Sequence, residues 1–338
     1  MRAVRIHEYG GPEVLRTEEV PIPEPGPGQV LIEAEAVSVG FAQTQMRRNA
    51  FPAPMWRPEF PITLGGDVVG DVVTVGPGVT GIAVGDRVGA FTLHGAYAEY
   101  VVVDADTVLP VPAALDAAQA TALPAPGPIA MGTMGTASLV PGESVLVHAA
   151  SGGIGHLAVQ LARLAGATVI ATAGTPEKCA YARSLGADVA VDYSRADWAD
   201  AVREATGGRG VDVILDSVGG EVLRQGVGLL APFGRLVFYG SAGGGPDIPA
   251  VSPMELIGMK FLTGFALSAW RSARPERYRA DHDALTAHLL AGTVRQTVHA
   301  TLPLEDVGKA HEIVESRAQL GRIVLLTGRG DRTTRSTA

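Results

Sequence analysis

The 338-residue chain has a single cysteine, Cys179, and only three of its 27 basic residues are lysines. One thiol excludes an intramolecular disulfide framework and any zinc site built from several cysteines. Basic runs are also absent, and the formal net charge is −8. This charge pattern argues against nucleic acid as the main partner of the protein.

The sequence also lacks a segment typical of a secretory signal or a membrane helix. Residues 1–7 (MRAVRIH) carry two arginines and alternate like a β-strand. The longest uncharged stretch, Ala117–Gly142, is interrupted by several prolines, which a simple membrane-spanning helix does not accommodate. With 46% hydrophobic residues the chain has enough apolar material for a core. We therefore expect a cytoplasmic protein that does not bind membranes.

Short β-type runs separated by glycine and proline turns occupy residues 1–123. The clearest runs are Val30–Val39, Val68–Gly76 and Tyr97–Val103. Many short strands with such turns are typical of a small closed or sandwiched β architecture.

From about residue 141 apolar strands alternate with helical segments. One helix is framed by Thr175 as N-cap, Pro176 in the first turn and Gly186 as the stop. The alternation predicts a doubly wound parallel sheet. The expected strands of this α/β region are Ser144–Ala150, Thr168–Gly174, Val189–Tyr193, Val211–Gly220 and Gly234–Ser241.

The pattern loosens again after Leu267. Helices are expected over Asp281–Leu290 and Asp306–Arg317, and strands over Thr297–Leu304 and Gly321–Leu326. The last ten residues, 329–338, contain no large apolar side chain and are expected to be disordered.

A glycine-rich turn joins the first strand and helix of the α/β region. Its sequence, Ala150–Gly155 (ASGGIG), fits G-x-G-x-x-G with alanine in the first position. Small residues let the backbone approach a pyrophosphate, and the following helix N-terminus supplies N–H groups and a favourable dipole. A plain glycine-rich turn is the alternative. The flanking strand and amphipathic helix favour dinucleotide binding.

The end of the second strand of this region bears on the choice of dinucleotide. NAD-binding chains place an acidic residue there for the ribose 2′-hydroxyl, whereas residues 171–176 read ATAGTP. Lys178 follows one turn later, where its charge could meet a 2′-phosphate; an ordinary solvated lysine is the alternative. The missing acid favours NADPH, although the adjacent Glu177 could weaken that preference.

Several longer motifs point to one family. With them, the chain resembles the zinc-free quinone oxidoreductase (zeta-crystallin-like) branch of the medium-chain dehydrogenase/reductase superfamily, over nearly the whole length up to Gly328. The motifs are HEYGGPEVL (7–15), VGPGVTGIAVGDRV (75–88), GAYAEYVVV (95–103), PGESVLVHAASGGIG (141–155), AGTPEKCAYARSLGA (173–187), DSVGG (216–220) and LGRIVLL (320–326).

The resemblance implies an α/β protein with two domains. A GroES-like β domain would be formed by residues 1–123 and 268–328, and a central Rossmann domain by residues 124–267. Cofactor and substrate would lie in the cleft between the domains. A homodimer built partly by sheet edges of the Rossmann domain is also implied.

The resemblance further implies roles for individual residues along NADPH. The pyrophosphate turn would be formed around Gly152–Gly155, Lys178 would bind the 2′-phosphate with Tyr193 beside it, and Phe265 would approach the nicotinamide. The full set of implied cofactor residues is Ser151, Gly152, Gly153, Ile154, Gly155, Thr172, Lys178, Tyr193, Ser217, Gly240, Phe265 and Arg322.

Zinc is not expected. Zinc alcohol dehydrogenases of the superfamily carry a Gly-His-Glu motif where this chain has Leu64–Asp67 (LGGD). The eight histidines show no paired i, i+4 spacing with a third ligand.

The chain departs from the family at positions that usually face the nicotinamide. Val39–Gln43 (VGFAQ) replaces Val-Asn-Pro-x-Asp, Phe51 replaces a tyrosine, and Pro128–Met131 (PIAM) replaces Leu-Thr-Ala-Tyr. The remaining polar candidates for catalysis are Gln43, Arg47 and His94, with Thr44 and Gln45 beside them. The apolar candidates for a substrate pocket are Phe41, Phe51, Ile129 and Met131, with Met55 and Trp56.

These features predict an NADPH-dependent reductase that transfers hydride to a small-molecule quinone or α,β-unsaturated carbonyl. The apolar candidates favour a bulky aromatic or polyketide-like substrate. Two alternatives stay open: a non-catalytic NADPH-binding sensor or scaffold, and a cyclase or isomerase without net redox chemistry.

Overall fold

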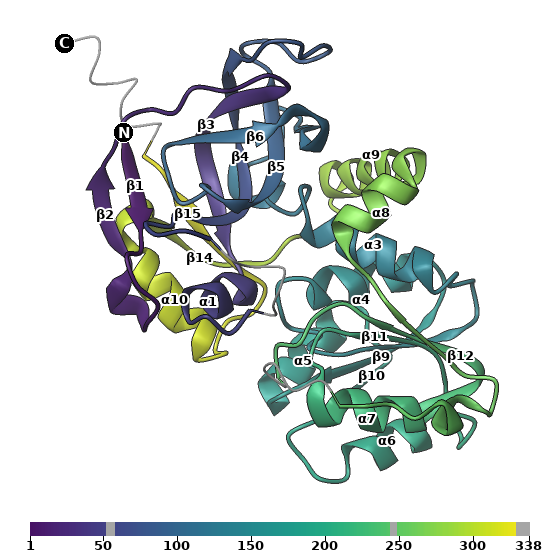
Figure 1. Cartoon of the computed structure of the whole chain (residues 1–338). Coiled ribbons are helices and arrows are strands. Elements are labelled where there is room, and N and C mark those ends of the chain that lie inside the picture. Colours follow the sequence, from purple (N-terminus) through teal and green to yellow (C-terminus); the bar gives the residue numbers. More distant parts are fainter. Residues whose placement is uncertain (52–57, 244–248, 329–338) are drawn as a thin grey trace. The chain divides into compact units, whose positions relative to one another are not determined.

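The computed structural model describes residues 1–51, 58–243 and 249–328. The chain divides into two compact units, the first formed by Met1–Ala125 with Thr286–Ala338 and the second by Pro126–Leu285 (Figure 1). The first boundary lies close to the expected one at residue 123. Residues 268–285 belong with the second unit, whereas the sequence placed them in the β domain. The expected disordered tail, 329–338, lies outside the described residues.

The first unit is built on a seven-stranded sheet to which both ends of the chain contribute. Its strand order is β14-β15-β3-β4-β5-β7, and β6 pairs with β3. The strands are β3 (Gln29–Val39), β4 (Leu64–Val75), β5 (Arg87–His94), β6 (Tyr100–Asp104), β7 (Leu109–Pro110), β14 (Val298–Pro303) and β15 (Arg322–Leu326).

Smaller elements complete this unit. A two-stranded sheet pairs β1 (Arg2–Arg5) with β2 (Arg16–Glu19). The α-helices are α1 (Phe41–Arg47), α2 (Ala117–Ala120) and α10 (Val307–Glu315). Buried valine, isoleucine and leucine side chains from the sheet form one core with residues of α10, such as Val307 and Val314. The apolar side chains that alternate along the short strands therefore form a β core, and residues of the C-terminal segment complete this core.

Glycines in β4 let the central strands approach closely. A Cβ atom at Gly65 would lie 1.9 Å from the carbonyl oxygen of Thr92, and one at Gly70 would lie 2.1 Å from that of Glu33. Only glycine fits at these positions without displacing the neighbouring backbone.

The second unit contains a six-stranded parallel sheet with the order β10-β9-β8-β11-β12-β13. Numbered from β8, this is the order 3-2-1-4-5-6 of a doubly wound dinucleotide-binding fold. The strands are β8 (Ser144–Val147), β9 (Thr168–Ala173), β10 (Val189–Asp192), β11 (Val211–Asp216), β12 (Leu230–Phe238) and β13 (Phe261–Gly264).

Helices cover both faces of this sheet, with α4 on one face and α6 and α7 on the other (Figure 1). Trp198 and Val202 of α6 and Leu223 of α7 share a core with the sheet. The helices are α3 (Pro126–Thr136), α4 (Gly155–Leu164), α5 (Pro176–Ser184), α6 (Trp198–Ala205), α7 (Gly220–Leu229), α8 (Leu267–Ala273) and α9 (Pro275–Ala291). None of the described helices is long and apolar enough to span a membrane.

Helix α3 explains why residues after 267 join the second unit. A Cβ atom at Gly132 would lie 2.6 Å from Cζ of Phe265, and one at Gly135 would lie 3.0 Å from the Trp270 ring. The two aromatic rings, 6.0 Å apart between centroids, therefore occupy the space that the glycines of α3 leave. This packing holds α8 against α3.

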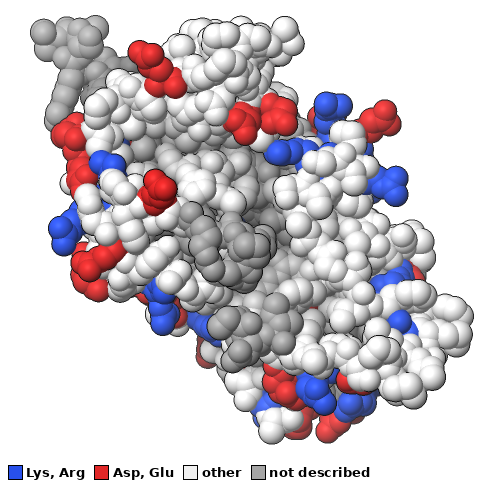
Figure 2. Space-filling model, viewed as in Figure 1, with Lys and Arg blue, Asp and Glu red and all other residues white. Residues whose placement is uncertain are grey.

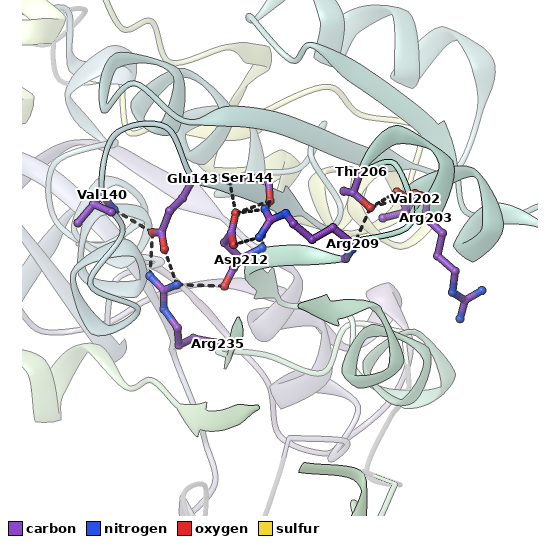
Figure 3. A network of polar contacts seen from close by, with 10 residues as sticks. Val140, Glu143, Ser144, Val202, Arg203, Thr206, Arg209, Asp212 and Arg235 are labelled. Carbon is purple, nitrogen blue, oxygen red and sulfur yellow. Dashed lines mark hydrogen bonds and ion pairs between the residues drawn. The ribbon is translucent and has the colours of Figure 1, made fainter. Parts of the chain in front are cut away.

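A polar network ties the amino ends of three strands together (Figure 3). The Asp212 carboxylate accepts hydrogen bonds from the backbone N–H and hydroxyl of Ser144, each at 2.8 Å, and pairs with Arg209 at 2.6 Å. Arg235 of β12 pairs with Glu143 at 2.7 Å. The network lies at the opposite end of the strands from the glycine-rich turn and is structural.

Candidate active site

The turn between β8 and α4 wraps around one carbonyl oxygen, that of Ala149. The N–H of Gly152 donates to it at 2.9 Å, and a Cβ atom at Gly155 would lie only 2.3 Å from it. Ala149 itself has φ of 50°. Gly155 is the first residue of α4, so the turn delivers the N–H groups of a helix N-terminus to one place. This arrangement suits a pyrophosphate.

His156 in the first turn of α4 fixes the same segment, and sequence reasoning missed it. Its Nδ1 lies 2.8 Å from the carbonyl oxygen of Gly152, and the side chain is fully buried. Ser151 is buried too, whereas Gly152, Gly153 and Ile154 are half-buried. A histidine directly after the glycine-rich motif was the available signal.

Two of the residues expected near a 2′-phosphate, Lys178 and Tyr193, follow the paired strands β9 and β10. Lys178 lies in the first turn of α5, where its N–H donates to the Thr175 hydroxyl at 3.3 Å, as the N-cap assignment predicted. A Cβ atom at Gly174 would lie 3.7 Å from the Tyr193 ring. Glu177 is exposed. Its pKa is lowered by backbone and Thr175 hydrogen bonds, so its carboxylate stays charged near this position.

Thr172 has a different environment from these residues. Its side chain is fully buried, and its hydroxyl lies 2.8 Å from Nδ1 of His148. The polar group that sequence reasoning directed toward the cofactor therefore has a protein partner inside the sheet.

The ends of β11, β12 and β13 place three more expected residues in one row. Ala242 N–H donates to the Ser217 carbonyl at 2.9 Å, and a Cβ atom at Gly240 would lie 3.3 Å from that same carbonyl. Phe265 N–H donates to the Phe238 carbonyl at 2.8 Å. Ile129, half-buried on α3, lies in the helix against which Phe265 packs, as does half-buried Met131.

In the first unit, strand register gathers several expected residues at one end of the sheet. Val39 at the end of β3 pairs with Ile323 of β15, and His94 at the end of β5 pairs with Leu64 of β4. Helix α1, with Gln43, begins directly after β3. Gln43, Asp67, His94 and Arg322 therefore come from neighbouring strand ends.

A buried ion pair lies at this end of the sheet. The Arg322 guanidinium contacts both the Ser38 hydroxyl and the Asp67 carboxylate, and the Ser38 hydroxyl donates to Asp67 at 2.5 Å. Burial raises the pKa of Asp67, and the charge of Arg322 acts against that rise. Because this acid neutralises Arg322, its charge is already compensated within the first unit. Sequence reasoning, which placed Arg322 beside the cofactor, did not foresee Asp67 as its partner.

The side chain of Gln43 is oriented by its own helix. Its Oε1 accepts the N–H of Gly40 at 3.0 Å, and the residue is 4% exposed. A backbone N–H can only donate, so the amide oxygen must face Gly40 and the amide nitrogen must point the other way. Beside it, half-buried Phe41 packs on the core of the first unit, with the Arg317 guanidinium 5.5 Å from its ring centre.

Arg47 and His94 have contrasting surroundings. Arg47 is fully buried and pairs with Glu315 of α10, and burial lowers its pKa. Its Nε and Nη1 have no hydrogen-bond partner within the described residues. His94 lies at the surface, and its pKa is lowered by partial desolvation.

Phe51, the last expected pocket residue of the first unit, is half-buried against the core. Met55 and Trp56 lie outside the described residues. Among residues 1–51, 58–243 and 249–328, no group of three or more histidine, cysteine, aspartate or glutamate side chains is arranged to hold a metal ion.

A β unit closed by the C-terminal segment, together with a 3-2-1-4-5-6 sheet and its glycine-rich turn, defines a two-domain dehydrogenase. Residues 26–113 match the family described as alcohol dehydrogenase GroES-like domain, and residues 153–286 match the one described as zinc-binding dehydrogenase.

Relatives that match over nearly the whole chain indicate the branch of the dehydrogenase family. The chain is 39% identical over 329 residues to 2-haloacrylate reductase of Burkholderia sp, covering 96% of this chain and 98% of that protein. It is 34% identical over 333 residues to quinone oxidoreductase of Rattus norvegicus, covering 96% and 98%. The solved structure of Escherichia coli quinone oxidoreductase complexed with NADPH matches with a TM-score of 0.89, 31% identity and coverage of 96% and 100%.

The chain therefore belongs to the medium-chain dehydrogenase/reductase superfamily, in its quinone oxidoreductase branch, and it is an oxidoreductase. The comparisons confirm the family and the fold class predicted from the sequence, a GroES-like domain with a Rossmann domain.

Proposed function

We propose that the protein is an NADPH-dependent reductase of small molecules that carry a carbon–carbon double bond conjugated to a carbonyl. The main support for this proposal is the glycine-rich turn, in which Gly155 lies against the Ala149 carbonyl. The turn suits a pyrophosphate and lies where this fold binds dinucleotides. Relatives named for 2-haloacrylate and quinone reduction support a reductase. A quinone acceptor is the second candidate, since the same hydride transfer serves both.

In this proposal the second unit holds the cofactor. The turn 151–155 binds the pyrophosphate, Ser217 and Gly240 line the dinucleotide, and Phe265, anchored on α3, lies near the nicotinamide. Lys178 pairs with the 2′-phosphate. Residues 171–176 at the end of β9 contain no acid that would repel this phosphate, although Glu177 follows them. Tyr193 lies beside this phosphate. The bound NADPH supplies a hydride.

Gln43 is the catalytic residue that the geometry of α1 favours. Hydride transfer to an enone develops negative charge on the carbonyl oxygen, and an oriented N–H donor stabilises that charge. The bond from the Gly40 N–H occupies Oε1, so the Nε2 donor of the Gln43 amide faces away from Gly40. Arg47 is buried in its pair with Glu315, which favours a structural role, and His94 remains a second candidate.

The expected pocket residues are consistent with an apolar substrate. Phe41, Phe51, Ile129 and Met131 are all half-buried, so each keeps apolar surface that a bulky aromatic or polyketide-like substrate could cover. On the face shown in Figure 2, acidic and basic residues are interspersed. That face has no large surface of one sign of the kind a polyanion binds.

The first experiment is a titration with NADPH and, separately, NADH, followed by nicotinamide fluorescence. We expect binding with a strong preference for NADPH. NADPH consumption is then measured with 2-chloroacrylate, a bulky aryl enone and a naphthoquinone. Tight NADPH binding without turnover of any acceptor would support a sensor or scaffold, and product formation without NADPH consumption would support a cyclase or isomerase. No binding of either nucleotide would refute the proposal.

The role of Gln43 is tested with Gln43→Glu, which keeps an oxygen for the Gly40 N–H but loses the amide donor. Loss of one such donor lowers turnover by roughly 100-fold or more, whereas the Kd for NADPH should not change. Lowering the pH should partly restore activity, because a protonated glutamic acid can donate again. Equal turnover of variant and wild type would exclude Gln43 as the donor.

We also propose that the protein forms a homodimer through β13. This strand is the edge of the parallel sheet, and an unpaired edge is a template for another strand. Around it, Phe261, Phe233, Ile257 and Met259 are each more than half exposed. Two antiparallel β13 strands would cover these side chains in a twofold contact. Light scattering should give a dimer for the wild type and a monomer for Phe261→Asp.

A further inference from the structure

Three buried polar side chains form a row across the parallel sheet of the second unit. Val147 of β8 pairs with Ala171 of β9 and with Leu215 of β11. The next residue on each strand is polar: His148, Thr172 and Asp216. The N–H of His148 donates to the Leu215 carbonyl at 3.1 Å, so the register continues through the row. Each of the three residues is 0% exposed.

The row is only partly satisfied within itself. His148 Nδ1 lies 2.8 Å from the Thr172 hydroxyl. The Oδ1 atom of Asp216 accepts the N–H groups of Val218 at 2.6 Å and Gly219 at 3.0 Å. His148 Nε2 and Asp216 Oδ2 have no partner in the part of the chain that the structure describes. Burying polar groups without a partner costs stability. This cost indicates that the two side chains have a role other than stabilising the sheet.

The row supports two loops at the carboxyl ends of the strands. His148 directly precedes Ala149, whose carbonyl is the centre of the glycine-rich turn, and the Thr172 carbonyl accepts the N–H of Ala150 at 2.9 Å. On the other side, Asp216 closes the loop that begins with Ser217. That loop contains Gly219 with φ of 72°, a left-handed conformation that the two bonds to Asp216 hold in place.

We propose that Asp216 is a positioning residue of the dinucleotide site, supported by His148. Asp216 fixes the 217–219 loop, and His148 with Thr172 fixes the start of the 149–155 turn. The spacing between the two loops then sets the affinity for NADPH. This inference rests on the proposed function, because both loops are assigned there to the cofactor.

A matched residue on the same strand separates positioning from general stabilisation. Asp212 lies at the amino end of β11, opposite Asp216. Its carboxylate also accepts a backbone N–H, that of Ser144. Removing either carboxylate leaves backbone donors without an acceptor. Only Asp216 lies at the end of the sheet where the cofactor loops begin.

The test compares Asp216→Ala, Asp216→Asn and Asp212→Ala by NADPH titration and by thermal unfolding. We expect Asp216→Ala to raise the Kd for NADPH at least 10-fold, with kcat at saturating NADPH within threefold of wild type. Asp216→Asn keeps an oxygen for both N–H groups and should stay within threefold in Kd. Asp212→Ala should lower the Tm and leave the Kd within twofold.

Other outcomes overturn the inference. Unchanged NADPH affinity in Asp216→Ala would do so, as would an equal loss of affinity in Asp212→Ala. If Asp216→Ala does not fold, His148→Gln takes its place, with an expected threefold or greater rise in Kd; an unchanged Kd there counts against the proposal. Wild-type protein that binds no NADPH would refute the proposed function itself, which is a distinguishable result.

Discussion

The network at the amino ends of the strands (Figure 3) allows one stability prediction to be worked through. Asp212→Ala removes the acceptor of both the N–H and the hydroxyl of Ser144, and it removes the ion pair with Arg209. Ser144 is 9% exposed, so no water replaces the carboxylate freely. A buried donor left without its acceptor costs about 1–3 kcal/mol.

The ion pair adds less. The Arg209 side chain is 57% exposed, and a pair screened by solvent contributes about 0.2–1 kcal/mol. Together the loss is about 1–4 kcal/mol, which lowers the Tm by roughly 2–16 °C for a unit of this size. The control is Asp200→Ala. Its side chain is 79% exposed in a pair with Arg203, and the expected loss is below about 1 kcal/mol.

The pH dependence has a definite sign. Hydrogen bonds from Arg209 hold the pKa of Asp212 well below its usual range. A carboxyl whose folded pKa is depressed contributes stability fully above its unfolded value of about 3.9, and loses that contribution as the pH falls further. The Tm difference between wild type and Asp212→Ala should therefore be constant near neutral pH and shrink below about pH 4.

The assay is differential scanning calorimetry of both variants and the wild type between neutral and acid pH. A Tm loss in Asp212→Ala no larger than in Asp200→Ala would refute this account. A loss that does not shrink in acid would show that the carboxylate charge is not what stabilises the network.

Four further predictions concern the cofactor site and the β core. Lys178→Ala should raise the Kd for NADPH at least tenfold and leave NADH binding unchanged, measured by nicotinamide fluorescence. Gly155→Ala should abolish NADPH binding in the same titration, because its Cβ would lie 2.3 Å from a carbonyl oxygen, whereas Gly228→Ala, with its nearest neighbour at 4.0 Å, should bind normally. Tyr97→Phe removes the 3.0 Å contact to His311 and should cost about 1 kcal/mol in urea unfolding. Because burial lowers the pKa of His311 to about 3, the stability that this neutral histidine contributes should fall as the pH drops below about 6.5 in wild type, and not in His311→Gln.

Local chemistry made much of the second unit predictable. The helix expected between Thr175 and Gly186 is α5. Thr175 is its N-cap, and Gly186, with φ of 106°, follows it. The glycine-rich turn likewise stands between a strand and a helix, as the sequence indicated. In each case the determining residues are neighbours in the chain, so their effect does not depend on what packs against them.

The sequence predicted the bounds of helices near proline and glycine less well. The prolines between Ala117 and Gly142 exclude a membrane span, but they did not predict helix α3, which begins at Pro126. Proline is tolerated in the first turn of a helix. Helix α9 begins at Pro275, earlier than the expected Asp281. The glycines of α3 are explained by the rings of Phe265 and Trp270, which are more than a hundred residues away in the chain.

The sequence by itself determined the alternation of strands and helices in the second unit, the dinucleotide turn and the family, because these depend on short-range patterns and whole motifs. Tertiary structure alone decided which polar side chains have a hydrogen-bond or ion-pair partner inside the protein. Arg322 meets Asp67 and Ser38 across 255 and 284 residues, and Thr172 meets His148 across neighbouring strands. Such partners are set by strand register and burial, where an unpaired charge or donor is costly, and no local pattern in the chain records them.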